Sequence, residues 1–140
     1  MFRISHSVQT LAAPEEIWAF VKDFSKWPLW MADLKMVHMQ GGLATGTQGL
    51  LYLVDDSVKE MLVQKFDLGF LEILVIKSFG VKLRFSVDIS QTNTGCKIKM
   101  EGELLGFMSL FHFFGTRRRL KRNIVPMTRR LGIVGQEIRR

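Results

Sequence analysis

The last quarter of the chain carries the pattern that most restricts the fold. Apolar residues recur there at spacings of four and three residues: Leu120, Ile124, Met127, Leu131, Val134 and Ile138. Residues three or four apart lie on the same face of an α-helix, so this stripe predicts one long amphipathic helix within 107–140. Pro126 lies inside the stripe and is expected to kink the helix or to join two helical pieces. A stripe of this length needs a second apolar layer to cover it.

The residues upstream of this helix are expected to supply that layer as a sheet. Alternation of apolar and polar residues indicates a strand with one buried face. Alternation and turn residues together predict seven strands, at 2–9, 34–40, 47–54, 58–66, 70–77, 81–91 and 96–104. The last six follow one another through short connections, which predicts antiparallel neighbours.

Two short helices are expected between the first two strands. The sequence Ala13-Pro14-Glu15-Glu16 is typical of a helix start, because proline suits the first turn and acidic side chains complement the helix dipole. Pro28 cannot continue that helix, so a second short helix or turn follows. This order of elements predicts an α+β fold in which a seven-stranded antiparallel sheet curls around the terminal helix. A strongly curved sheet cannot close fully on one helix, and the gap is expected to be an apolar cavity.

Composition places the chain among globular proteins with their own core. It has 140 residues, of which 47% are hydrophobic, and one cysteine, Cys96, which cannot form an internal disulfide. The N-terminus lacks the apolar segment of a secretory signal. The longest nearly uncharged run, 104–116, is too short to cross a bilayer, which takes about 20 apolar residues. We therefore expect a soluble, cytoplasmic protein.

The net charge of +7 belongs to the terminal helix. Residues 117–140 carry eight arginines, one lysine and one glutamate, for +8, whereas residues 1–116 carry eleven bases and twelve acids, for −1. The basic surface is expected to consist of Arg117, Arg118, Arg119, Arg122, Arg129 and Arg130. A solvated outer face is the simplest interpretation, and docking on an anionic membrane surface is the alternative. Nucleic acid is the less favoured partner.

Three stretches of the sequence resemble a known family. The run from Val8 to Trp30, which contains Ala-Pro-Glu-Glu and Trp-Pro-Leu-Trp, resembles the opening of the START/Bet v 1-like superfamily. The similarity is to its polyketide cyclase/dehydrase and lipid-transport branch. Leu43-Ala-Thr-Gly-Thr-Gln is similar to the start of that branch's third strand, and Asn93-Thr-Gly-Cys to the turn before its last strand.

This resemblance covers essentially the whole chain and implies the helix-grip fold. It also implies that 1–140 is a single domain with a deep cavity for a hydrophobic small molecule between the sheet and the terminal helix. Lipid carriers, hormone receptors and aromatic polyketide cyclases share this fold, so the fold does not choose among these functions.

No catalytic motif stands out in the sequence. There is no Gly-rich phosphate loop and no nucleophile elbow. His6, His38 and His112 lie far apart without metal-ligand spacing, so we expect neither a metal nor a cofactor.

A cyclase or dehydratase would still need a general acid and base in the cavity. Strand parity offers His6, His38, Glu60 and Gln64 as inward candidates, with Tyr52 on a strand whose inward face is open. Glu60 would need a partner or a raised pKa among apolar neighbours. The opposite register, with Met61 and Val63 buried and Glu60 exposed, is equally compatible with the pattern.

Three functional hypotheses remain. The first is a binding protein or carrier for a lipid-like or aromatic molecule. Its cavity residues are expected to be Trp27, Trp30, Phe107 and Phe111 at the mouth, with Phe85, Met100 and Leu104 deeper. The second is a cyclase-like enzyme that uses Glu60 or a histidine, and it is the minority reading. The third is an adaptor that works through the Arg-rich helix.

Overall fold

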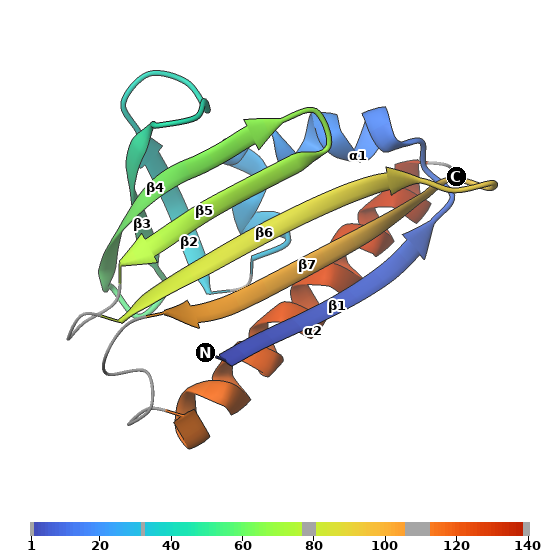
Figure 1. Ribbon diagram of the computed structural model, residues 1–140. Coiled ribbons are helices and arrows are strands. Elements are labelled where there is room, and N and C mark those ends of the chain that lie inside the picture. The colour runs from blue at the N-terminus through green and yellow to red at the C-terminus, as the bar shows by residue number, and fades with distance from the viewer. Residues whose placement is uncertain (1, 32, 77–80, 106–112, 139–140) are drawn as a thin grey trace.

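The computed structural model describes residues 2–31, 33–76, 81–105 and 113–138. Ten elements follow one another along the chain (Figure 1): β1 (Phe2–Thr10), α1 (Pro14–Val21), the 3₁₀ helix η1 (Phe24–Leu29), β2 (Leu34–Met39), β3 (Gln48–Leu53), β4 (Val58–Asp67), β5 (Phe70–Ile76), β6 (Lys82–Gln91), β7 (Cys96–Leu105) and α2 (Phe113–Ile138). The seven strands, the two short helices and the long terminal helix expected from the sequence are confirmed.

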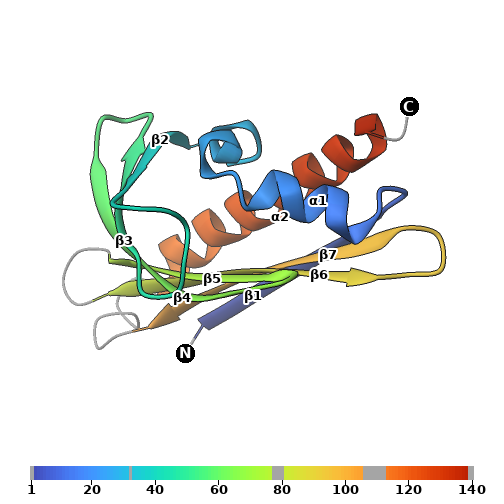
Figure 2. The same cartoon turned by 90° about the horizontal axis from the view of Figure 1, so that it is seen from above.

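The strands form one sheet in the order β1-β7-β6-β5-β4-β3-β2, and every neighbouring pair is antiparallel. Figure 2 shows α1 and α2 on the same face of this sheet, with β2 and β3 rising beside them. The segment with α1 and η1 carries the chain from one edge strand, β1, to the other, β2. The expected α+β fold, a curved antiparallel sheet against a C-terminal helix, is therefore confirmed.

Helix α2 lies along β1 and β7 and contacts α1. It is continuous through Pro126, so of the two expected alternatives, a kink or a join between two helical pieces, the join is wrong. None of the helices in the described part of the chain is long and apolar enough to span a bilayer.

Small residues bring the C-terminal half of α2 close to β1. A Cβ atom at Gly132 would lie 3.0 Å from Val8 Cγ2, and one at Gly135 would collide with Thr10 Oγ1 and lie 2.9 Å from Ile17 Cδ1. Among residues 122–137 of α2, the buried residues are Ile124, Thr128, Leu131, Gly132 and Gly135, while the side chains of Leu120 and Ile138 lie outside those described. Met127 and Val134, which belong to the predicted stripe, are only partly buried.

Two β-bulges change which residues face the helix. In β2 the register shifts between Leu34 and Met36, and Leu34 is 5% exposed whereas Met36 is 51% exposed. In β4 the register shifts between Val63 and Lys65. A bulge adds one residue to one strand, so the alternation inverts on its far side. Simple parity therefore fails beyond each of these two points.

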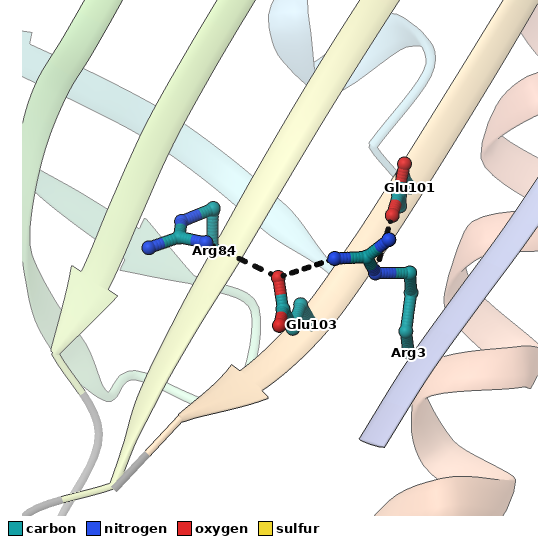
Figure 3. Close-up of polar contacts among 4 residues, drawn as sticks. All are labelled: Arg3, Arg84, Glu101 and Glu103. Atoms are coloured by element: carbon teal, nitrogen blue, oxygen red, sulfur yellow. Dashed lines mark hydrogen bonds and ion pairs between the residues drawn. The ribbon is translucent and has the colours of Figure 1, made fainter. Parts of the chain in front are cut away.

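A charged cluster joins three strands on the opposite face of the sheet from α2. Glu103 on β7 stands between Arg84 on β6 and Arg3 on β1 in one cross-strand row. Glu103 Oε2 lies 3.2 Å from Arg84 Nη1 and 3.4 Å from Arg3 Nη2, and Arg3 Nε lies 2.7 Å from Glu101 Oε1 (Figure 3). The Glu103 side chain is only 7% exposed, so its charge depends on these two guanidinium groups.

The close contact at Gly135 predicts an unusual response to alanine. In an exposed helix Gly→Ala stabilises by about 1 kcal/mol, but here the added methyl group meets Thr10 and Ile17. Gly135→Ala should therefore lower the free energy of unfolding by about 1–3 kcal/mol in urea denaturation. Gly42→Ala, where nothing lies within 4 Å of the added atom, is the matched control and should change little. A Gly135→Ala variant as stable as the parent would contradict the close packing of α2 on β1.

The charged cluster predicts a cost for neutralising Glu103. Arg3 and Arg84 are 62% and 38% exposed, so water can solvate them when the carboxylate is lost. Glu103→Gln should then lower the free energy of unfolding by about 1–2 kcal/mol, between the values for surface and buried pairs. The loss should shrink at high salt. Glu60→Gln, at an exposed position without an ion pair among the described residues, is the control; equal losses in both variants would refute the role of Glu103.

Candidate functional site

The described residues line a partly open cavity of about 190 Å³ between the inner face of the sheet and α2. It lies between β3, β5 and β6 and the middle of the helix, and Met31 and Asp33, just before β2, line one side. Its lining consists of Met31, Asp33, Leu34, Leu51, Leu53, Lys59, Ile73, Val75, Leu83, Phe85, Arg122, Asn123, Ile124, Pro126, Met127 and Arg130. These residues belong to β2, β3, β4, β5, β6 and α2 and to the segment before β2. Because these parts of the chain are distant in sequence, only the folded structure assembles the site.

The floor of the cavity is apolar because each strand turns its alternate residues toward α2. Leu51 and Leu53 come from β3, Ile73 and Val75 from β5, and Leu83 and Phe85 from β6. In the sheet register, Val75 pairs with Leu83 and Ile73 with Phe85. Since cross-strand partners share a face, the side chains from β5 and β6 form one continuous surface.

Phe85 connects the cavity to the aromatic core. Its ring stacks on Trp30, with ring centroids 6.4 Å apart, and Trp30 packs edge-on against Trp27 with centroids 6.3 Å apart. The Trp27 Nε1–H group donates a hydrogen bond to the Val21 carbonyl oxygen at 2.7 Å, which fixes η1 against the end of α1. The wall behind Phe85 is therefore held in place by packed indole rings.

Most of the expected cavity residues lie elsewhere. Trp27 and Trp30 are fully buried in the core and do not line the cavity, so their expected position at its mouth is corrected. Met100 and Leu104 are also buried outside the lining, because β7 packs directly against α2. Phe85 lies in the lining. Phe107 and Phe111 lie outside the described residues.

The expected acid and base candidates are not assembled in the cavity. Glu60 is exposed, while Met61 and Val63 are buried. The register with Glu60 outward is therefore the observed one, and the inward placement of Glu60 is wrong. His38 is exposed because the bulge after Leu34 reverses the parity of β2. Tyr52 pairs with two exposed residues and faces the outer side of β3.

The remaining two candidates lie on the inner side or in an irregular segment. His6 is half-buried on β1 in the alternation that turns Val8 toward α2, but it does not line the cavity. Gln64 is the extra residue of the β4 bulge, and its Oε1 atom is buried without a hydrogen-bond partner among the described residues. His112 lies outside the described residues. No described cluster of His, Cys, Asp or Glu side chains could hold a metal ion.

The polar residues of the lining were not identified from the sequence as cavity residues. Lys59 pairs with Leu51 across β3 and β4, so it shares the inward face with Met61 and Val63. The register that turns Glu60 outward also turns Lys59 inward. In the sequence, that register was the signal that could have identified Lys59 as a cavity residue. Arg122 and Arg130 were expected as basic surface; both are exposed and both also line the cavity. Arg129 is exposed outside the lining, and the side chains of Arg117, Arg118 and Arg119 are not among those described.

The site and the fold together define a curved sheet that grips a long helix with an apolar cavity between them. The chain belongs to the polyketide cyclase/dehydrase and lipid transport family, whose model matches residues 1–131. The family resemblance seen in the sequence is thereby confirmed. No curated protein matches the sequence.

Solved structures share the fold at low sequence identity. A hypothetical protein from Helicobacter pylori has a TM-score of 0.78 and 12% identity, over 96% of this chain and 88% of that chain. Norcoclaurine synthase from Thalictrum flavum has a TM-score of 0.73 and 15% identity, over 95% and 85%. The di-domain aromatase/cyclase StfQ of the steffimycin biosynthetic pathway has a TM-score of 0.76 and 12% identity, over 98% of this chain and 51% of that chain. At these identities the similarity shows the fold alone.

Cys96 is the one thiol of the chain, and its position predicts low reactivity. It is fully buried, and burial raises the pKa of the thiol, with smaller contributions from the carboxylates of Glu15 and Glu16. Because the thiolate is the reactive form, a disulfide reagent at pH 8 should label the folded protein on the order of a hundredfold more slowly than the protein in guanidinium chloride. Equal labelling rates would show that this part of the sheet opens readily.

Proposed function

We propose that the protein binds a small, largely apolar molecule in the cavity between the sheet and α2. The observation that carries this proposal is the cavity itself, whose floor consists of apolar side chains from β3, β5 and β6, with those of β5 and β6 paired across the sheet. An apolar cavity can bind an apolar molecule, because transfer into the cavity removes that molecule from water.

The family description supports a ligand-binding role of this kind, since it combines polyketide chemistry with lipid transport. One solved structure of norcoclaurine synthase, with a TM-score of 0.70, is a complex with dopamine and hydroxybenzaldehyde, so small aromatic molecules occupy a related fold. Binding or carriage is preferred to catalysis here because Glu60, His38 and Tyr52 face away from the cavity.

The size of the cavity limits the ligand. A volume of about 190 Å³ corresponds to roughly six water molecules at their share of liquid volume, about 30 Å³ each. That is room for an apolar body of about six carbon atoms, such as one aromatic ring or a short acyl chain. Burial of five or six methylene-sized groups at about 0.8 kcal/mol each gives a dissociation constant on the order of a millimolar.

These figures predict that hexan-1-ol binds with a dissociation constant on the order of a millimolar. Titration followed by ¹H–¹⁵N NMR should shift the resonances of residues that line the cavity, Val75, Leu83 and Phe85 among them. Leu83→Trp, which places an indole ring in the cavity, should abolish these shifts.

Leu68→Trp provides the matched control for this experiment. Leu68 is 86% exposed in the turn between β4 and β5, so the same substitution there leaves the cavity open and binding should persist. Unchanged hexan-1-ol binding in a folded Leu83→Trp variant would refute the proposed site. Absence of any binding to the parent protein would refute the proposed function.

A further inference from the structure

One inward position of the sheet carries a charge. On β4 the alternation Lys59, Met61, Val63 faces α2, and the latter two side chains are buried core residues. Lys59 pairs with the buried Leu51 and lines the cavity, where it is half-buried. A lysine at the end of an apolar inward row is unexpected on packing grounds, because an ammonium group loses hydration there.

Helix α2 brings two further cations to the same cavity. Asn123, Met127 and Arg130 recur at spacings of four and three, and Arg122 and Pro126 flank them. These residues form a helix face distinct from the one that packs on β1 through Gly132 and Gly135. Along the cavity side of the helix, Arg122 and Asn123 thus lie at one end and Arg130 at the other, with apolar residues between them.

The charges at the cavity do not balance. Lys59, Arg122 and Arg130 contribute +3 and Asp33 contributes −1, which leaves +2 around an otherwise apolar lining. None of the three cations forms an ion pair with a carboxylate in the part of the chain that the structure describes.

The charge of Lys59 acts on the carboxylate of Asp55. The Ser57 hydroxyl and backbone N–H hold the pKa of Asp55 below its usual value, and the charge of Lys59 is a smaller cause. Asp55 is fully exposed and already accepts hydrogen bonds from Ser57. Among the described residues, Lys59, Arg122 and Arg130 thus lie at the cavity without a carboxylate in ion-pair contact.

From this arrangement we propose that the ligand is an anionic amphiphile, with a short apolar body in the cavity and a carboxylate or phosphate group held by Lys59, Arg122 and Arg130. The inference rests on the proposed function and deepens it by naming the chemistry of the ligand. Charge-assisted hydrogen bonds from guanidinium and ammonium groups are the strongest that side chains offer to such oxygens, and the Asn123 amide can add a neutral donor. A cationic amine of the same shape meets three like charges and is disfavoured.

A series of ligands with one tail and different head groups tests this directly. Hexanoate, hexyl phosphate, hexan-1-ol and hexylammonium are titrated at pH 7 and low salt by ¹H–¹⁵N NMR, with acetate as the anion without a tail. We expect hexanoate or hexyl phosphate to bind at least about tenfold tighter than hexan-1-ol, a difference of about 1.4 kcal/mol, and hexylammonium to bind more weakly than hexan-1-ol. The preference for the anions should fall as salt rises, because these charges are partly exposed.

Paired variants separate the cavity cations from the general basic charge of the helix. Arg130→Leu and Lys59→Met should remove most of the preference for the anion while hexan-1-ol still binds. Arg129→Leu and Lys65→Met remove the same charge from the neighbouring helix position and from an exposed position on β4, and both should keep the preference. Asp33→Asn should tighten hexanoate binding, because it removes the one negative charge of the lining.

The possible outcomes test separately the anionic head group and the binding of an apolar molecule in the cavity. Equal affinities for hexan-1-ol and both anions would overturn the anionic head group while the apolar cavity stands. Tightest binding of hexylammonium, or acetate as tight as hexanoate, would overturn it as well. A preference lost equally in Arg129→Leu and Arg130→Leu would assign it to the overall charge of α2. Failure of all hexyl ligands to bind would refute the proposed function itself. Comparison of hexanoate with hexyl phosphate then shows which head group the site prefers.

Discussion

The close packing of α2 on β1 is the constraint on which the rest of the structure depends. Gly132 and Gly135 allow the second half of the helix to lie against Val8 and Thr10 without intervening side chains. The middle of the helix, with Pro126 and Met127, lines the cavity together with residues of β3, β5 and β6. The close contact at Gly132 and Gly135 and the cavity beside residues 122–130 thus occupy different parts of the same helix.

Ion pairs on one face of the sheet and aromatic packing on the other support the strands beneath α2. Glu103 links β7 to β6 and β1 through Arg84 and Arg3 on the opposite face, which restrains the edge strand that receives the helix. On the inner face, Trp27 and Trp30 fill the space under η1 and support Phe85 at the cavity wall. The floor of the site thus rests on packed core residues, and its polar groups lie on β4, on one face of α2 and at Asp33.

The fold divides the basic residues of α2 between the cavity and solvent. In the sequence the arginines of the last helix form one basic group, but in the fold they divide. Arg130 and Arg122 reach the cavity, whereas Arg129 points to solvent. Neighbouring residues on a helix point about 100° apart, so a single position separates a residue that can contact a bound ligand from one that serves solubility.

The sequence by itself determined the elements and the fold class. Alternation in the strands, Pro14 at the start of α1 and the stripe of α2 are local signals, and a family resemblance reinforced them. It did not determine the cavity. The bulge after Leu34 inverted the face of His38, and the two registers of β4 differed only in whether Lys59 or Glu60 turns inward.

Only the tertiary structure decided these points, because strand parity depends on pairing with distant segments rather than on local pattern. The same holds for Trp27 and Trp30. As large amphipathic residues they fit a pocket mouth or a core equally well, and the neighbouring Phe85 and Val21 placed them in the core. Local periodicity fixes what an element is, while the contacts across the sheet fix which of its side chains meet the ligand.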